Sequence, residues 1–581
     1  MTKRQLPEGW RMVRLRDVLS TLESGLRPKG GVRGVLKGVA SIGAEHLNDE
    51  GGFDLSNLRY IPQDFYTRMQ RGRIQAGDIL VVKDGATTGK VSFVPSDWPF
   101  DKSAANEHVF VLRPNREALA EYLFFYLYSP VGQHDIKKSF HGSAQGGINQ
   151  SFAAHVPVPL PPLPVQERIV QILQKADEIR RKRKEALDLA ETLRRALFVN
   201  MFGEPGNNER SWPVGPLGQL LTPEIERINP SVAWPDDDFT YIEIAAVHGY
   251  RITHPKRLLG KEAPSRARQV VKAGDILYSM TRPNLRNIAV VPEELDRAIC
   301  TTGFCVLRPK RPEDGPFVFE IVKSDYFTEA MSRLAEAKSL YPAVDESQIR
   351  DFQVIQPPEP ARAHFGRIVQ KLSDVEMSVL KGLTDTEAIF ATLLSRAFTG
   401  ELTADWEAVN AEAIRQRQAF EEQVPRLVAL DLLAEKAAST APAAPEAGLL
   451  LTAMMKLLFL VQMKGSARRR FYHFVPYHYG PFAKELYDDL ERLQQEGLVS
   501  IEQADEDKTR LMLADADRAR QMVAQLPDDL RQDVRTVLDE YGGLTHNQLL
   551  ARVYEEFPAY ARRSRLRHAA AKKAGTGRSA T

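Results

Sequence analysis

Cysteine and long apolar runs are scarce in this 581-residue sequence. Its two cysteines, Cys300 and Cys305, are too few for a disulfide framework or a zinc cluster, and we expect buried strand thiols in a reducing compartment. The most apolar run, 449–463, contains Lys456 and is too short to cross a bilayer. The opening residues lack the apolar core of a signal peptide. These absences predict a cytoplasmic protein that does not span a membrane.

Net charge is also nearly missing from the chain. Lys and Arg number 78 and Asp and Glu number 76, for a formal charge of +2. Because the two signs balance, any surface that attracts nucleic acid must be local.

Signals for catalysis are weak or incomplete. Residues 85–91 resemble a phosphate-binding loop but are one residue short between the glycines, so we expect a tight turn. Pro235-Asp236 and Glu243 resemble part of a metal-dependent nuclease motif, but Ala245 stands where its lysine would be. The 12 histidines show no ligand spacing. We therefore expect no cofactor, no metal and no catalytic residue in this chain.

An internal repeat organises the first 400 residues. The stretch 76–80, Ala-Gly-Asp-Ile-Leu, recurs at 273–277, an offset of 197 residues (273 − 76). The Val-Leu-Arg-Pro sequence of 111–114 recurs at 306–309. Low similarity outside these turns indicates a scaffold that is kept while the surface diverges. The predicted units are 1–163, 164–202, 203–362 and 363–402, a globular part and a helix used twice.

Two long amphipathic helices follow the two globular parts. The stretch 164–201 repeats its seam residues four and three positions apart, the rhythm of a narrow helix-packing seam. The seam residues are Val165, Ile169, Ile172, Ala176, Ile179, Arg183, Ala186, Ala190, Leu193 and Leu197. The second helix repeats the rhythm at Phe365, Ile368, Leu372, Val375, Val379, Ile389 and Leu393. We expect the two seams to pack on each other.

The predicted fold class is α+β. Each globular part alternates short β-like runs with Gly, Pro and Asp and then continues into a helix. Residues 403–447 are assigned to a charged helix and a linker, 448–568 to a small, mostly helical C-terminal domain of winged-helix type, and 569–581 to a basic tail.

Polar, partly basic loops follow the Gly-Asp-Ile-Leu strand in both copies. Arg, Lys, Asn and Thr pair with base edges and phosphate oxygens, and recurrence at equivalent places favours binding over solvated loops. A glycine-rich basic segment near the N-terminus suits phosphates, although a solvated loop explains it nearly as well. The candidate DNA-binding residues are Arg27, Lys29, Lys83, Asp84, Lys90, Lys102, Arg282, Asn284 and Arg286.

The order of motifs resembles the specificity subunit of type I restriction-modification systems. The resemblance covers residues 1–402 and rests on the repeated strands, on Leu-Pro-Pro-Leu-Pro-Val-Gln-Glu-Arg at 160–168, on Phe-Gly-Glu-Pro at 202–205 and on Arg-Ala-Phe-Thr-Gly-Glu-Leu at 396–402. The second copy departs from the pattern at 356–362, which lacks the Gln-Glu pair. Residues 456–459 and 479–482 are similar to the Panacea or SocA-antitoxin-like domain.

The resemblance implies a DNA-binding subunit of a phage-defence system that is not itself an enzyme. The two globular parts would be target-recognition domains, with two antiparallel helices as the spacer between them. The implied partners are double-stranded DNA, two methyltransferase subunits and restriction-translocase subunits. The target would be bipartite and asymmetric, since the two copies differ in sequence.

Two alternatives remain open from the sequence. The chain as a whole could be a self-sufficient nuclease or methyltransferase whose active site is unrecognised. The C-terminal domain is expected to have a regulatory or protein-binding role, but its helix after 479–481 could instead enter a DNA groove. Four acidic residues on that helix argue against contact with phosphates.

Overall fold

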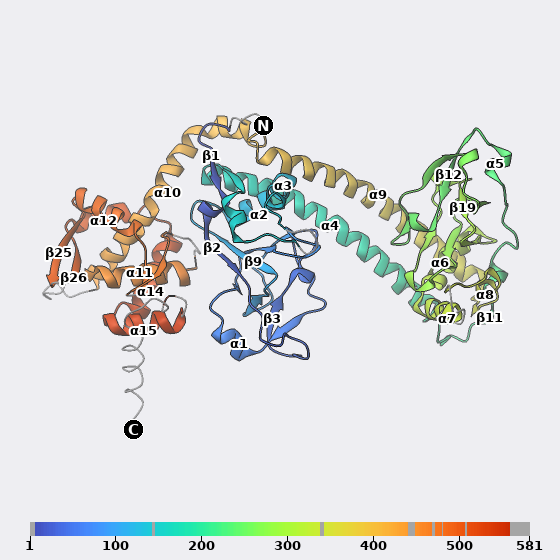
Figure 1. Cartoon of the computed structure of the whole chain (residues 1–581), viewed down its shortest axis with the longest axis horizontal. Coiled ribbons are helices and arrows are strands. Elements are labelled where there is room, and N and C mark those ends of the chain that lie inside the picture. The colour runs from blue at the N-terminus through green and yellow to red at the C-terminus, as the bar shows by residue number, and fades with distance from the viewer. Residues whose placement is uncertain are drawn as a thin grey trace, which may run out of the picture. The chain divides into compact units, whose positions relative to one another are not determined.

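The computed structural model describes residues 6–141, 146–336, 342–439, 448–466, 471–478, 480–505, 508–557 and 560 (Figure 1). Residues 440–447 of the predicted charged helix and linker (403–447), Tyr479 and the basic tail lie outside these residues. The chain divides into two compact units, 1–177 with 388–581 and, separately, 178–387. Within the described ranges, no helix is long and apolar enough to cross a membrane.

The first globular part contains two four-stranded sheets, one antiparallel and one mixed, and a helical layer. The antiparallel sheet has the order β2-β9-β6-β7, and the mixed sheet, in which β3 and β8 run parallel, has the order β4-β3-β8-β5. The strands of the antiparallel sheet are Leu19–Ser24, Val109–Pro114, Ile79–Val82 and Val91–Phe93, and those of the mixed sheet are Arg59–Ile61, Val39–Ile42, Ser103–Ala105 and Arg73–Ile74. The helices are α1 (Gln63–Arg68), α2 (Ala120–Tyr128) and α3 (Pro130–Lys137).

Strand β6 forms the centre of this part because both of its faces are buried. Successive strand residues point to opposite faces. Ile79 and Val81 belong to the core that contains α2, while Leu80 and Val82 belong to a second core on the other face. The run Ile-Leu-Val-Val is therefore fully apolar rather than alternating.

The second globular part repeats this arrangement. Its central sheet has the order β18-β17-β20, built from Ile288–Val290, Ile276–Ser279 and Phe304–Leu307. Ile276 and Tyr278 face the core that contains the helices, and Leu277 faces the other core. A second sheet, β15-β12-β19-β16, contains Lys256–Leu259, Asp238–Ile242, Ile299–Thr301 and Ala267–Val270. Short strands β13 (Val247–His248) and β14 (Arg251–Ile252) pair with each other next to β18 of the central sheet. The helices are α5 (Pro230–Ala233), α6 (Gly315–Lys323), α7 (Asp325–Glu336) and α8 (Glu346–Arg350).

The expected strands and helices of the repeat are confirmed, and so are the buried strand thiols. Cys300 lies on β19 and Cys305 on β20, both fully buried. Burial raises the pKa of the Cys305 thiol to about 12. Each globular part is also closed in the same way, because its first strand pairs with the strand that precedes the long helix. These pairs are β1 (Arg11–Arg14) with β10 (Pro157–Leu160) and β11 (Val214–Pro216) with β21 (Gln353–Ile355).

The two long helices are α4 (Leu163–Phe202) and α9 (Glu359–Ala397). The Arg183 guanidinium donates to the Gly382 carbonyl oxygen and to the Thr386 hydroxyl, and Arg194 pairs with Glu376. Partner numbers fall along α9 as they rise along α4, so the helices run antiparallel there. This agrees with the arrangement that the family resemblance implied.

Four of the predicted apolar seam residues are exposed, whereas the predicted seam residue Ala190 is buried. Ile179 and Leu193 are 40% and 54% exposed, and Val375 and Ile389 are 58% and 56% exposed. The apolar ends of the helices enter the globular cores, as Val165 and Phe198 do. Between these ends the two helices meet through the polar contacts of Arg183, which the sequence placed in the seam, and of Arg194, which it did not.

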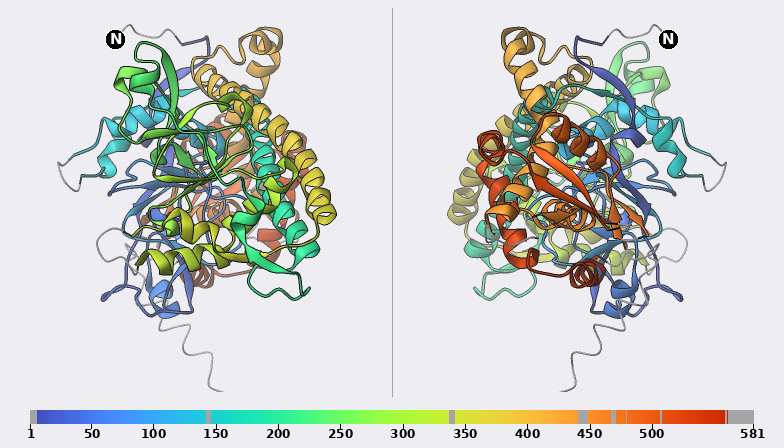
Figure 2. Two further views of the ribbon diagram at one scale, coloured as in Figure 1. Left: turned by 90° about the vertical axis from the view of Figure 1, so that its right-hand side faces the viewer. Right: turned by 90° about the vertical axis from the view of Figure 1, so that its left-hand side faces the viewer.

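The C-terminal part is a helical cluster with a hairpin. Its elements are β22 (Leu449–Leu450), α11 (Leu451–Lys464), β23 (Val475–Tyr477), β24 (Gly480–Phe482), α12 (Glu485–Gln495), β25 (Val499–Asp505), β26 (Lys508–Leu513), α13 (Ala516–Val523), α14 (Asp528–Tyr541) and α15 (His546–Glu556). Figure 2 shows the orange hairpin β25–β26 beside these helices. Helix α10 (Ala404–Ala438) precedes them, and its segment from Val424 to Leu433 packs into their core. The second half of the predicted charged helix is thus part of the C-terminal fold.

Candidate nucleic-acid interface

A buried ion pair recurs in both globular parts. Asp78, fully buried at the start of β6, accepts two hydrogen bonds from Arg113 on β9, from Nε and Nη2, each 2.7 Å long. In the second copy Asp275 accepts from Nε and Nη2 of Arg308 at 2.8 and 2.7 Å. The repeated Gly-Asp-Ile-Leu and Leu-Arg-Pro motifs meet because β6 and β9, like β17 and β20, are antiparallel neighbours. We name these two ion pairs the Asp–Arg clamps.

Each clamp carboxylate also accepts from a backbone amide three residues upstream. The Gln75 amide donates to Asp78 at 2.9 Å, and the Lys272 amide donates to Asp275 at 2.7 Å. This bond tightens the turn before the strand, in which a glycine with positive φ precedes the aspartate in both copies. The hydrogen bond to Asp275 also raises the pKa of Arg308, so the guanidinium stays charged.

The loop after the clamp strand is held by an equivalent segment in both copies. Ile148 donates its amide hydrogen to the Lys83 carbonyl at 2.8 Å, and Val344 donates to the Met280 carbonyl at 2.9 Å. Isolated bridges join Asp84 with Gly147 and Thr281 with Ala343. The two loops are therefore presented by the same backbone scaffold, although their side chains differ.

In the first copy, charged side chains gather around this loop. Asp84 accepts from His108 at 2.5 Å and lies 3.4 Å from the Lys83 ammonium, which donates to the Glu107 carbonyl at 2.7 Å. The Arg27 guanidinium lies 3.0 Å from the Glu107 carboxylate. We call Arg27, Lys83, Asp84, Glu107 and His108 the charged cluster. The sequence reasoning missed Glu107 and His108, whose position just before the repeated Leu-Arg-Pro strand was the available signal.

The other predicted residues of the first copy lie apart from this cluster. Lys90 follows the tight turn, as predicted for 85–89, but its ammonium lies 2.7 Å from Asp49 and its side chain is only 20% exposed. Lys102 is exposed just before β8, and Lys29 is exposed in the segment before β3. Lys90 is therefore engaged within the fold, which leaves it less available to a ligand.

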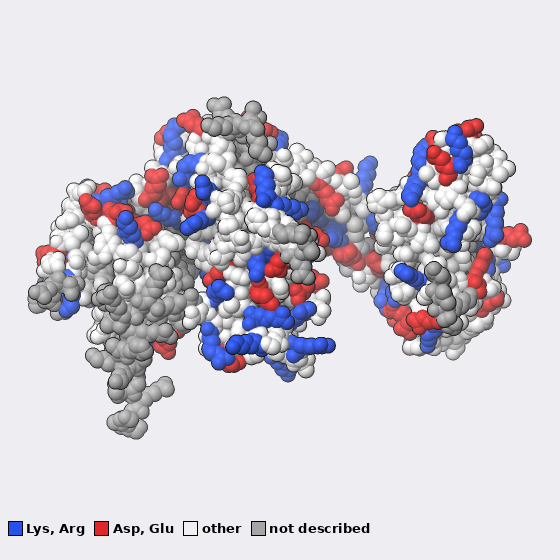
Figure 3. Space-filling model, in the orientation of Figure 1, with Lys and Arg blue, Asp and Glu red and all other residues white. Residues whose placement is uncertain are grey.

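The basic surface of the first copy extends beyond the predicted residues. Figure 3 shows Lys and Arg side chains gathered over α1 and β3. The exposed basic residues of this region include Arg33, Lys37, Arg59, Arg68 and Arg71. Two of them are paired, Arg59 with Glu45 and Arg68 with Asp64.

In the second copy, the predicted residues form one short loop. Arg282 has φ +49° and Arg286 has φ +51°, left-handed conformations that are uncommon for side chains other than glycine. Arg282 and Asn284 are exposed, but the Arg286 guanidinium pairs with Asp325, and that bond raises the pKa of Arg286 and lowers that of Asp325. Arg282 and Asn284 are therefore free to meet a ligand, whereas Arg286 supports the loop.

The acidic residues that suggested a nuclease are held by lysines. The Asp236 carboxylate lies 3.4 Å from Lys261, and the Glu243 carboxylate lies 2.7 Å from Lys256. They flank opposite ends of β12, which at about 3.3 Å per residue places them some 20 Å apart. Among the residues that the structure describes, no group of three or more His, Cys, Asp and Glu side chains could hold a metal ion.

The comparisons with known proteins agree with the resemblance seen in the sequence. Residues 7–189 match the family model of the type I restriction modification DNA specificity domain. This match covers the first globular part and continues into helix α4.

Three relatives and one solved structure are also similar to this chain. The EcoKI specificity subunit of Escherichia coli (strain K12) is 22% identical over 440 residues, covering 71% of this chain and 94% of that subunit. The EcoDI subunit of Escherichia coli is 28% identical over 145 residues, 24% of this chain and 31% of that subunit. A Methanocaldococcus jannaschii protein named as the MjaX specificity subunit is 24% identical over 220 residues. The match covers 37% of this chain, and the chain spans about half (51%) of the length of that subunit. The crystal structure of an S subunit from M. genitalium covers 68% of this chain and 98% of that one, with 15% identity and a TM-score of 0.45.

Proposed function

We propose that this chain is the DNA-recognition subunit of a type I restriction-modification complex. Its two globular parts read two different half-sites of a bipartite target, and partner subunits carry out methylation and cleavage. The observation that carries this proposal is the duplicated clamp and loop, two copies of one scaffold whose exposed side chains differ. The specificity domain matched at residues 7–189 supports the same conclusion.

The side chains of the two loops favour recognition of different DNA sequences by the two copies. In the first, Lys83 and Arg27 provide positive charge beside two acids and a histidine. In the second, Arg282 and Asn284 are exposed and suited to bidentate contacts with guanine and adenine edges in the major groove. The two half-sites should therefore differ, unlike those of a homodimer.

The middle of the helices suits partner subunits better than a mutual seam. Exposed apolar residues in water favour burial by another protein. These residues are Ile179, Leu189, Leu193, Val375, Met377 and Ile389. We propose that methyltransferase subunits cover them, two per chain because the globular part and helix occur twice, and that restriction-translocase subunits join this assembly.

The alternative of a self-sufficient nuclease or methyltransferase has no support in the described part of the chain. The acids that suggested it are engaged by lysines, and no cofactor loop was found in the sequence. The purified chain alone is expected to leave plasmid DNA uncut and unmethylated.

The decisive experiment maps methylated adenines across the genome of the source strain and of a strain that lacks this gene. We expect one asymmetric bipartite motif to disappear with the gene. Exchange of residues 210–355 for those of a related subunit should replace one half-site and leave the other unchanged. An unaltered methylation pattern, or the loss of a palindrome, would contradict the proposal.

A further inference from the structure

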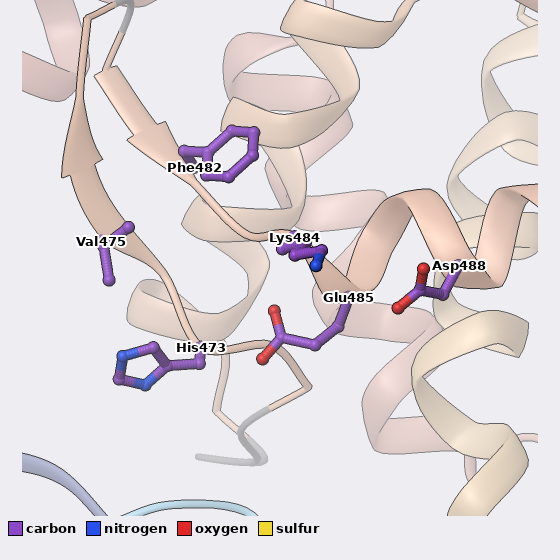
Figure 4. A pocket seen from close by; sticks show the side chains of 6 residues that line it. All are labelled: His473, Val475, Phe482, Lys484, Glu485 and Asp488. Atoms are coloured by element: carbon purple, nitrogen blue, oxygen red, sulfur yellow. The ribbon is translucent and has the colours of Figure 1, made fainter.

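The C-terminal part contains an open pocket that the proposed DNA recognition does not use. It has a volume of about 320 Å³ and lies between the strands β23 and β24 and the start of helix α12 (Figure 4). The residues that line it are His473, Val475, Phe482, Lys484, Glu485 and Asp488. Glu485 and Asp488 point along one side of the hollow, opposite His473 and Val475.

Aromatic rings continue from the apolar wall of this pocket onto the surface. The centroid of the Phe482 ring lies 4.9 Å from that of Tyr477 and 5.9 Å from that of Tyr487, and both pairs of rings are tilted. Tyr477 and Tyr487 are 45% and 46% exposed. Exposed aromatic faces beside carboxylates attract guanidinium groups, through cation–π contacts and charge-assisted hydrogen bonds.

The negative charge of helix α12 also favours a ligand with guanidinium groups. Glu485, Asp488 and Glu491 are accompanied by Asp489, whereas Arg492 is the only basic residue between positions 485 and 495. Asp489 is engaged by the Tyr472 hydroxyl at 3.0 Å. Among the residues that line the pocket, the two carboxylates of Glu485 and Asp488 outnumber the single ammonium group of Lys484, so a basic segment is the complementary occupant.

A basic segment of this chain begins beside the pocket. The Tyr560 hydroxyl donates to the carbonyl of Phe474 at 3.4 Å, and Phe474 lies between the pocket residues His473 and Val475. Residues 561–581 follow, without Asp or Glu and with the basic residues Arg562, Arg563, Arg565, Arg567, Lys572, Lys573 and Arg578. The seven residues up to Arg567 reach about 23 Å when extended, enough to pass from Tyr560 into the pocket.

We propose that residues 561–581 of this chain dock into the pocket of its own C-terminal part. Arginines of the segment pair with Glu485 and Asp488 and stack on Tyr477 and Tyr487, and Leu566 contacts Val475 and Phe482. This docking holds a basic segment away from DNA and from partner subunits. The inference does not depend on the proposed function.

The test uses a fluorescein-labelled synthetic peptide of residues 561–581 and the chain truncated after Tyr560. Fluorescence anisotropy should show binding to the truncated chain. The full chain should bind the peptide about 100-fold more weakly, because its own tethered segment competes at an effective concentration near the millimolar range. Raising the salt from 0.05 to 0.3 M should weaken binding, because the pairs are partly exposed.

Three variants of the truncated chain separate the effect of charge from a loss of folding. Glu485→Gln with Asp488→Asn should weaken peptide binding about tenfold, the range for two partly exposed pairs. Tyr487→Ala should also weaken peptide binding, because it removes an aromatic ring without changing the charge of the chain. Asp528→Asn with Asp539→Asn removes the same charge from exposed positions of α14 and should change binding less than twofold. Circular dichroism melting checks that each variant is folded.

Two outcomes would overturn the docking. Equal peptide binding by the full and truncated chains would mean that the segment does not occupy the pocket. The second is that the peptide does not bind the truncated chain and that truncation weakens DNA binding by the same factor for every DNA sequence. In that case the segment binds DNA phosphates rather than the pocket. Neither result would affect the mapping of methylated motifs, so the proposed function is tested separately.

Discussion

The two globular parts share a buried ion pair and differ in the loop beside it. In the first copy Gly85 stands where the second has Arg282, and both positions have positive φ, +94° and +49°. The first loop places Lys83 among charged neighbours, whereas Met280 occupies the equivalent place in the second. The comparison teaches that a buried charge pair can hold a loop backbone constant while the exposed side chains change. Recognition can therefore diverge without loss of the scaffold.

The largest effect is expected from changing the distance between the copies rather than either loop. Removing one heptad from both α4 and α9 shortens each helix by about 10 Å, equal to about three base pairs of duplex. The natural target should then lose one half-site, and with it much of the 4–10 kcal/mol that separates specific from non-specific binding. Selection from randomised gaps should recover a target with the same half-sites and a shorter spacer. If the preferred gap stays unchanged, the helices do not set the spacing.

A smaller loss is expected when either clamp is broken. Asp78→Asn and Asp275→Asn each leave a largely buried arginine, 17% exposed in both copies, without its charged partner. Each should destabilise its own part by about 3–5 kcal/mol, the cost of removing one member of a buried pair. Urea unfolding of the full chain measures this loss, with Asp64→Asn at an exposed pair as the control. Losses that differ greatly between the copies would show that the two clamps are not equivalent.

The buried cysteines can report the same loss in one copy alone. Both thiols lie in the second copy, and at pH 8 burial keeps them protonated, since the Cys305 pKa of about 12 lies far above the pH. Labelling by a thiol reagent then requires local opening. Asp275→Asn should accelerate labelling by about 100-fold or more, whereas Asp78→Asn should leave the rate near that of the native chain. Equal acceleration by both variants would mean that the two copies open together.

The smallest effect is expected at the loop itself. Arg282→Gly gives the second copy the glycine of the first at a position with positive φ, so the stability of the fold should be kept or slightly raised. Discrimination at one base of one half-site should fall by about 1–3 kcal/mol if Arg282 contacts that base. Binding to targets with single base changes measures this, with Arg268→Ala as a half-buried control elsewhere in the same copy. An equal loss of affinity for every target sequence would mean that Arg282 contacts a phosphate instead of a base.

The sequence alone determined the repeat and the long helices and indicated the family that the chain resembles. These are properties of local spacing: glycine turns, apolar runs and helical rhythm depend on residues that are close in the chain. The strand that begins at Ile79 and the helix that ends at Phe202 could be placed from neighbouring residues. The same local signals carried the family resemblance.

Only the tertiary structure decided which charged side chains are available to a ligand. Lys90 is neutralised by Asp49 and Arg286 by Asp325, partners 41 and 39 positions away. The Asp–Arg clamps likewise join residues 35 and 33 positions apart, and Arg194 on α4 pairs with Glu376 on α9, 182 positions away. Ion pairs form wherever the fold brings opposite charges within about 4 Å, a distance that sequence spacing does not encode.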